Sequence, residues 1–159
     1  MIIEELEIEK PVATADELIN QLVAMGSYIH NLYLQSHLIH FNIEGPLFLP
    51  VHKYLKKQYE LHIEQFDAIG EFIRSMDYLL PMCGRGLMGA CKGFKHVKSY
   101  DARESLTVYA KNLEAAGFMA KDLGKMAKEV GAPDIENYMA EIVGMMFKSA
   151  WFLKATLRD

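Results

Sequence analysis

Apolar residues recur at spacings of three and four along four stretches of the chain, which is the pattern of amphipathic helices. The first stretch opens at Thr14 with Glu17 three residues later, a pairing typical of a capping box, and runs to about Phe41. The second runs from near Pro50, a residue tolerated in a first turn, to about Met76. The apolar stripe of this second helix is predicted to comprise Leu55, Tyr59, His62, Phe66, Ile69 and Phe72.

Two further helices are predicted in the second half of the chain. One opens at Asp101 with Glu104 three residues on, and Gly131 is its expected C-terminal cap. The other runs from about Asp134 to Leu157. The residues expected to face inward are Leu106, Tyr109, Leu113, Ala116, Met119 or Ala120, Leu123 and Met126 on the third helix, and Ile135, Met139, Ile142, Met146, Ala150 and Leu153 on the fourth.

The connections decide the topology. Short loops join the first helix to the second and the third to the fourth, whereas residues 77–100, rich in glycine, form a long crossover with room for one short helix. Two antiparallel hairpins joined by a long crossover are the ferritin-like form of the four-helix bundle. We therefore predict an all-α fold and one domain spanning residues 1–159, in which residues 1–13 are a short acidic N-terminal tail.

Composition and charge argue against several classes of function. The chain has 159 residues and a net charge of −4, which disfavours a charge-driven nucleic-acid binder. No stretch approaches the ~18–20 apolar residues of a membrane helix, and the start of the chain lacks the basic and apolar parts of a secretory signal. A cytoplasmic protein without membrane contact is expected. Cys83 and Cys91 are expected to be reduced thiols, although a bridge between them stays open.

Histidines are the first candidates for chemistry. His30, Tyr33, His37 and His40 lie at spacings of three and four on one face of the first helix. His52 follows His40 by twelve residues, across a tight loop. For one histidine an interface role with a satisfied imidazole is the more common explanation, but three on one face favour a metal site.

Two carboxylates on the second helix are the matching candidates. Asp67 and Glu71 are four residues apart, so they share a face and can hold one cation, although a solvated acidic face is the alternative. His52 and Asp67 are about 22 Å apart along the helix axis, so one chain cannot bring them to the same metal. A second chain packed with its own second helix antiparallel would do so, with a two-fold axis near Glu60–Leu61. Mixed imidazole and carboxylate ligands suit Fe(II), Mn(II) or Zn(II).

These residues carry a resemblance to a known family. The run from His40 to Phe48 (HFNIEGPLF), then His52, then the Asp67-x-x-x-Glu71-x-x-Arg74 pattern, resembles the signature of the Dps family of mini-ferritins. The similarity continues through most of the chain, over Leu79–Gly89, Lys98–Ser99–Tyr100, Asp134–Lys148 and Trp151–Leu153.

The resemblance implies a hollow homo-dodecamer built from two-fold dimers. It implies a ferroxidase centre at each dimer interface, with His40 and His52 from one subunit and Asp67 and Glu71 from the other. Fe(II) would be oxidised there, usually with hydrogen peroxide and otherwise with dioxygen, and stored inside as ferric mineral; zinc or manganese could substitute for iron. Iron would enter through acidic pores near the start of the last helix, for which Asp134 is a candidate.

Two departures from the family pattern qualify these expectations. Lys56 stands where the family commonly has an aspartate, and its charge would repel a second cation, so we expect one tightly bound iron. A metal-binding shell with weak ferroxidase activity is the corresponding alternative. The chain also lacks a Lys/Arg-rich tail, so a nucleoid-binding shell is disfavoured and DNA binding should be weak or absent. A short basic run consists of Lys92, Lys95, His96 and Lys98, for which a solvated loop is the alternative. Roles for His30, His37 and His62 stay open.

Overall fold

The computed structural model describes residues 12–158, which form five helices and no strand. The helices are α1 (Ala15–Asn42), α2 (Phe48–Ser75), α3 (Gly84–Met88), α4 (Ala102–Val130) and α5 (Pro133–Leu157). The prediction of four long helices, with a short one inside the crossover, is confirmed. Most of the predicted acidic tail, residues 1–11, lies outside the described residues.

The helix ends follow the capping signals in the sequence. The Glu17 amide donates to Thr14 Oγ1 (3.2 Å) and the Thr14 amide donates to Glu17 Oε2 (3.0 Å), so the capping box is complete. At the start of α4, the Glu104 amide donates to Asp101 Oδ2 (2.9 Å). Gly131 ends α4 with φ = 82°, a left-handed conformation in which glycine has no steric penalty. α2 begins two residues before Pro50, close to the predicted start, and neither α2 nor α5 has a side-chain N-cap.

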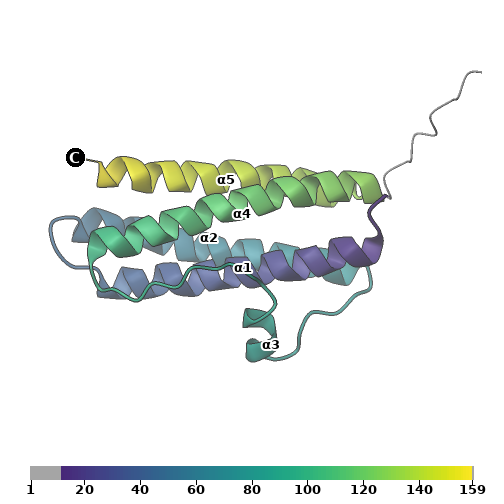
Figure 1. The fold of residues 1–159 in the computed structure, drawn as a ribbon, viewed down its shortest axis with the longest axis horizontal. Coiled ribbons are helices and arrows are strands. Elements are labelled where there is room, and N and C mark those ends of the chain that lie inside the picture. The colour runs from purple at the N-terminus through teal and green to yellow at the C-terminus, as the bar shows by residue number, and fades with distance from the viewer. Residues whose placement is uncertain (1–11, 159) are drawn as a thin grey trace, which may run out of the picture.

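The long helices form two antiparallel hairpins (Figure 1). α1 packs against α2, α4 packs against α5, and α4 also lies against α1. The crossover returns along α1, and α3 stands on the outer side of the bundle in contact with that helix. Among the described residues, no helix has the length and apolar character needed to cross a membrane.

The core corrects two parts of the predicted stripes. On α2, the predicted Tyr59, Phe66 and Phe72 are only half-buried, and polar side chains take inward positions instead. The buried residues of α2 are Val51, Leu55, Gln58, His62, Gln65, Ile69 and Ile73. Because the two glutamines and the histidine are hydrogen-bonded inside the bundle, their burial leaves no polar atom unsatisfied.

On α4, the structure selects Ala120 from the predicted pair Met119 or Ala120, and Ala127 takes the inward position predicted for Met126. Ala120 and Ala127 are fully buried, whereas Met119 and Met126 are half-buried. Small side chains let the two helices approach closely: a Cβ added at Gly117 would lie 2.7 Å from the Phe147 ring. The stripe predicted for α5 is confirmed, since all six of its residues are buried.

Candidate metal centre

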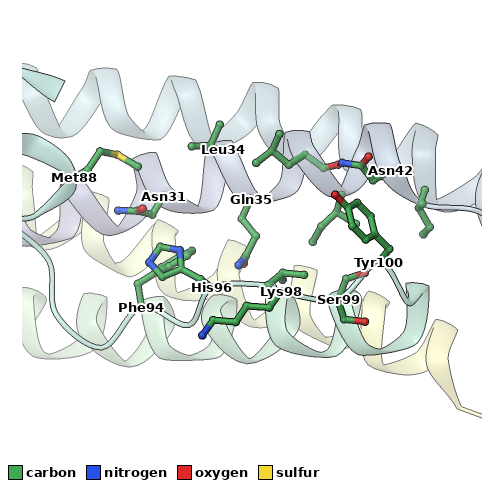
Figure 2. A pocket seen from close by; sticks show the side chains of 15 residues that line it. Asn31, Leu34, Gln35, Asn42, Met88, Phe94, His96, Lys98, Ser99 and Tyr100 are labelled. Atoms are coloured by element: carbon green, nitrogen blue, oxygen red, sulfur yellow. The ribbon is translucent and has the colours of Figure 1, made fainter. Parts of the chain in front are cut away.

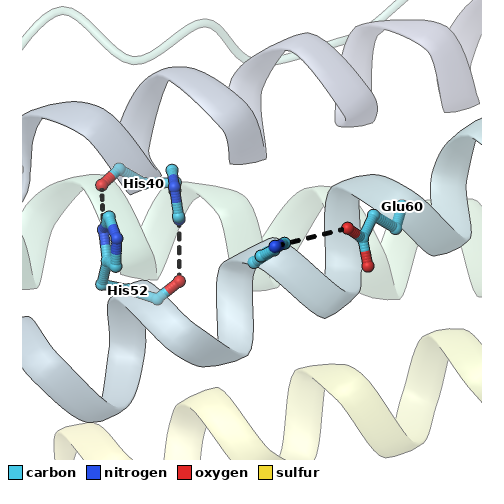
Figure 3. A network of polar contacts seen from close by, with 4 residues as sticks. His40, His52 and Glu60 are labelled. Carbon is cyan, nitrogen blue, oxygen red and sulfur yellow. Dashed lines mark hydrogen bonds and ion pairs between the residues drawn. The ribbon is translucent and has the colours of Figure 1, made fainter.

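His40 and His52 form a stacked pair where α1 ends and α2 begins. Their ring centroids are 3.7 Å apart with an interplanar angle of 15°. His40 Nδ1 donates to the His52 carbonyl (2.8 Å), and His52 Nδ1 donates to the His40 carbonyl (2.7 Å), as Figure 3 shows. The His40 carbonyl is available because it lies in the last turn of α1, where carbonyls have no partner within the helix.

This reciprocal pairing fixes the protonation pattern of both rings. A carbonyl oxygen can only accept, so each Nδ1 carries a proton, and in the neutral form of each ring Nε2 is the nitrogen with the lone pair. A backbone carbonyl on one ring nitrogen is the usual partner that orients a histidine whose other nitrogen binds metal. Burial lowers the pKa of His40; the hydrogen bond to the His52 carbonyl opposes this, and the charges of His52, His37 and Lys56 add to the lowering, so the ring is neutral at neutral pH.

Aromatic side chains surround the histidine pair. His37 stacks on Tyr59 (centroids 4.0 Å apart) and on Phe41 (4.6 Å). Tyr59 also meets the edge of His40, at 5.2 Å. His37 therefore supports the pair by packing. The sequence placed Tyr59 in the apolar stripe of the second helix and gave no sign of its contact with the histidines, which depends on its place opposite His37.

His30 and His62 lie outside the pair. His30 Nδ1 is 3.2 Å from Met88 Sδ in the crossover, and its ring packs on Phe66 (5.1 Å). His62 is 1% exposed and belongs to the bundle core, where burial lowers its pKa to about 4. His62 and His52 thus lie on different faces of α2.

Asp67 and Glu71 are exposed on α2, far from the histidine pair. Fifteen residues separate Asp67 from His52 on one continuous helix, so about 22 Å lies between them along its axis. Neither carboxylate has a hydrogen bond or ion pair within the part of the chain that the structure describes. Among those residues, no group of three histidine, cysteine or carboxylate side chains converges as a metal site would require. One subunit thus holds the four candidate ligands in two separate pairs.

Lys56 lies one turn after His52. Its Nζ is 4.0 Å from Glu60 Oε1, and both side chains are more than half exposed (Figure 3). Such an exposed pair contributes little to stability and leaves the ammonium free to move. The charge is close enough to His40 to help lower its pKa.

Large apolar side chains are exposed on the same two helices. Leu38 is 49% exposed, Phe41 65% and Ile63 47%. Exposed apolar area next to unpartnered carboxylates is typical of a surface that a partner covers.

The remaining candidates lie elsewhere on the surface. Asp134 is exposed in the first turn of α5, together with the half-buried Glu136. The four side chains of the basic run are exposed on the crossover, and Cys83 and Cys91 are free thiols. A mostly apolar groove of about 400 Å³ separates the crossover from α1, with His96 and Lys98 among its lining residues (Figure 2).

Comparison with known proteins agrees with this architecture. Residues 16–159 match the Ferritin family, described as a ferritin-like domain. The chain therefore belongs to the ferritin-like family. No curated protein matches it.

Solved structures narrow the fold to the Dps type. Dps from Staphylococcus aureus superposes with a TM-score of 0.87 at 15% identity, covering 93% of this chain and 99% of that one. The Vibrio cholerae Dps protein gives 0.83 at 22% identity over 90% of each chain, and is described as a member of a superfamily of ferritin-like diiron-carboxylate proteins. A dodecameric thioferritin from Bacteroides fragilis gives 0.84 at 14% identity, covering 89% and 84%. The resemblance to Dps proteins seen in the sequence is confirmed at the level of the fold.

Proposed function

We propose that this protein is an iron-sequestering mini-ferritin that oxidises Fe(II), with hydrogen peroxide as the main oxidant, at centres shared between two subunits. The observation that carries the proposal is the reciprocal pairing of His40 and His52. It sets both Nδ1 atoms as donors, so that Nε2 is the nitrogen of each ring that can bind a divalent transition metal.

The other ligands come from the partner subunit in this proposal. With two copies of α2 antiparallel about a two-fold axis near Glu60–Leu61, the histidine pair of one chain faces Asp67 and Glu71 of its mate. The same packing covers the exposed apolar side chains Leu38, Phe41 and Ile63. The symmetry creates two centres per dimer, one at each end of the helix pair.

The ligand set favours iron as the substrate. Imidazole and carboxylate together suit Fe(II), and also Mn(II) or Zn(II), better than calcium or magnesium. Zinc has no redox chemistry, so it would occupy the centre without turnover. The diiron-carboxylate description of the V. cholerae relative supports iron, and the dodecameric B. fragilis relative supports assembly of two-fold dimers into a shell of twelve chains. We place this shell in the cytoplasm, with ferric mineral inside and Asp134 at the iron-entry pores.

Lys56 is the observation that favours a second candidate, a metal-binding shell with weak ferroxidase activity. Its ammonium stands one turn from His52 and near His40, where it disfavours a second cation. With one Fe(II) per centre, the protein would supply a single metal electron for each oxidant molecule. DNA binding through the basic run is a weaker proposal, because the net charge of −4 opposes phosphate contacts.

Stopped-flow absorbance after mixing with Fe(II) and peroxide tests the main proposal. His52→Ala is expected to slow ferric formation roughly 100-fold or more, since loss of a ligand's orienting partner alone costs about 10–100-fold in metal affinity or activity and His52 is proposed as a ligand. His96→Ala, an exposed histidine of the crossover, is the matched control and should oxidise iron at the wild-type rate. Equal rates in wild type and His52→Ala would contradict the assignment of the centre. Slow oxidation by wild type itself would favour the weak-ferroxidase shell.

A further inference from the structure

A tyrosine and a histidine are paired in the middle of the bundle, apart from the metal centre. Tyr109 comes from α4 and His62 from α2, and they are 0% and 1% exposed. Tyr109 Oη lies 2.7 Å from His62 Nε2, a short hydrogen bond. Nothing in the proposed iron site uses either side chain.

Neighbouring amides fix the direction of this hydrogen bond. Gln65 turns its amide nitrogen to Met145 Sδ (3.8 Å), so its carbonyl oxygen faces the His62 ring, 2.9 Å from Nδ1. His62 Nδ1 therefore carries the proton, and Nε2 accepts one from the tyrosine. Gln58 Nε2 donates to the same phenol oxygen from 3.4 Å, which leaves the Tyr109 proton for His62.

The pair is neutral, with a base ready beside the phenol. Burial raises the pKa of Tyr109 and lowers that of His62, so at neutral pH the phenol is protonated and the imidazole is not. A buried phenol that loses an electron must also lose its proton, because a cationic phenol has no compensating charge there. His62 Nε2 is a base at hydrogen-bond distance for that proton.

A second buried tyrosine shows what is particular to this pair. Tyr28 is 2% exposed, and its hydroxyl donates to Asn112 Oδ1 at 3.2 Å. An amide oxygen is a poor proton acceptor compared with a neutral imidazole. Both tyrosines are thus buried, but of the two it is Tyr109 whose hydroxyl is hydrogen-bonded to a base.

We propose that Tyr109, paired with His62, is a one-electron donor that completes the reduction of peroxide when a centre holds a single Fe(II). This inference rests on the proposed ferroxidase function and on the one-iron centre expected from Lys56. Reduction of hydrogen peroxide to two waters needs two electrons, and one Fe(II) supplies only one.

The step balances with Tyr109 as the second donor. The peroxide O–O bond breaks, Fe(II) becomes Fe(III), and Tyr109 gives the second electron. Its O–H bond breaks, the proton moves to His62 Nε2, and two protons from solvent complete two waters. The products are Fe(III), two waters, and a neutral tyrosyl radical beside an imidazolium. A further Fe(II) reduces the radical, and His62 returns the proton to the phenol oxygen.

The position of the pair suits this role. His62 lies five residues before Asp67 on α2, which is about 7.5 Å along the helix axis. Tyr59 is the competing donor, because its ring is 5.2 Å from that of His40. Within the described part of the chain, however, the Tyr59 hydroxyl has no hydrogen bond to a base.

Freeze-quench electron paramagnetic resonance on the assembled protein tests the proposal. After loading with one Fe(II) per subunit and mixing with equimolar peroxide, wild type should show a tyrosyl signal that Tyr109→Phe lacks. His62→Gln retains Tyr109 and should reduce the signal at least about tenfold, because the base is gone. Tyr28→Phe and Tyr59→Phe are the controls and should keep it. A signal that survives in Tyr109→Phe, disappears in Tyr59→Phe or is unchanged in His62→Gln would overturn the proposal.

A second measurement separates this inference from the proposed function. A photogenerated ruthenium polypyridyl oxidant applied to metal-free protein needs no iron chemistry. It should oxidise exposed aromatic residues such as Tyr100 and Trp151 in every variant, and in wild type and Tyr28→Phe it should add a Tyr109 radical signal that is absent in Tyr109→Phe. If wild type fails to oxidise Fe(II) quickly yet forms this radical, the function fails and the redox pair stands. If Fe(II) is oxidised quickly and neither method gives a radical that depends on Tyr109 and His62, the pair has no redox role.

Discussion

Mixing two inactive variants measures whether the iron centre is shared between subunits. His52→Ala removes a ligand from the histidine half, and Asp67→Ala removes one from the carboxylate half. The two halves of one chain are separated by fifteen residues of continuous helix, about 22 Å. Neither variant alone can complete a centre, because in a homogeneous assembly every centre contains the same lesion.

A mixed assembly should recover a definite fraction of activity. In a dimer of unlike chains, one centre takes its histidines from the Asp67→Ala chain and its carboxylates from the His52→Ala chain, so it is intact, while the other centre carries both lesions. If chains pair at random, half of the dimers are mixed and each has one intact centre of two. About a quarter of all centres, and about a quarter of the wild-type rate, should return.

The assay is stopped-flow ferric absorbance on assemblies co-expressed with two affinity tags and purified through both. The matched control mixes His52→Ala with His40→Ala, whose lesions lie in the same half and cannot complement each other. Its rate should stay at the level of the single variants. Recovery in this control, or no recovery in the test mixture despite double-tag purification, would refute a centre made of two chains.

Three further predictions follow from other contacts. Lys56→Asp should raise anaerobic Fe(II) binding from about one to about two ions per subunit in calorimetric titration, since a repelling charge becomes a ligand; an unchanged stoichiometry would contradict the role of Lys56. Burial lowers the pKa of His62 to about 4 from 6.5, so between those values the unfolded chain binds more protons than the folded one, and stability decreases as the pH is lowered from 6.5 to 4, by roughly 3 kcal/mol. Urea unfolding from pH 7 to pH 4 should show this loss in wild type and a smaller one in His62→Gln; equal losses would argue against it. Plasmid DNA should not shift on a gel at about 150 mM salt without divalent metal, because the acidic shell opposes phosphate contacts, and a clear shift would reverse that view.

Much of the fold was predictable from the sequence because its signals are local. The capping box at Thr14 and the glycine cap at Gly131 mark helix ends through contacts over three or four residues. The stripe of α5 is uniformly apolar, and it was predicted correctly. On α2, the inward face carries Gln58 and Gln65, whose burial depends on partners from α4 and α5, and the stripe was misplaced toward the aromatic residues.

Part of the candidate site was likewise predictable from the sequence, and part was not. Residue type and spacing identify His40, His52 and the carboxylate pair Asp67 and Glu71, and helix rise alone separates the two halves. The reciprocal carbonyl contacts could not be foreseen, because they require the end of α1 to meet the start of α2 at a definite register. The pairing of Tyr109 with His62 could not be predicted either, since 47 residues separate the two in the sequence.

In the proposed centre, the exchange of hydrogen bonds between His40 and His52 would also link metal affinity to local order at one end of the bundle. Each imidazole is oriented by the backbone of the opposite helix, so fraying of the last turn of α1 would release both rings together. Bound iron would then oppose that opening, and amide hydrogen exchange in this turn should slow as metal is added. The two histidines thereby make the tip of the first hairpin a segment whose local unfolding the cell's free iron would control.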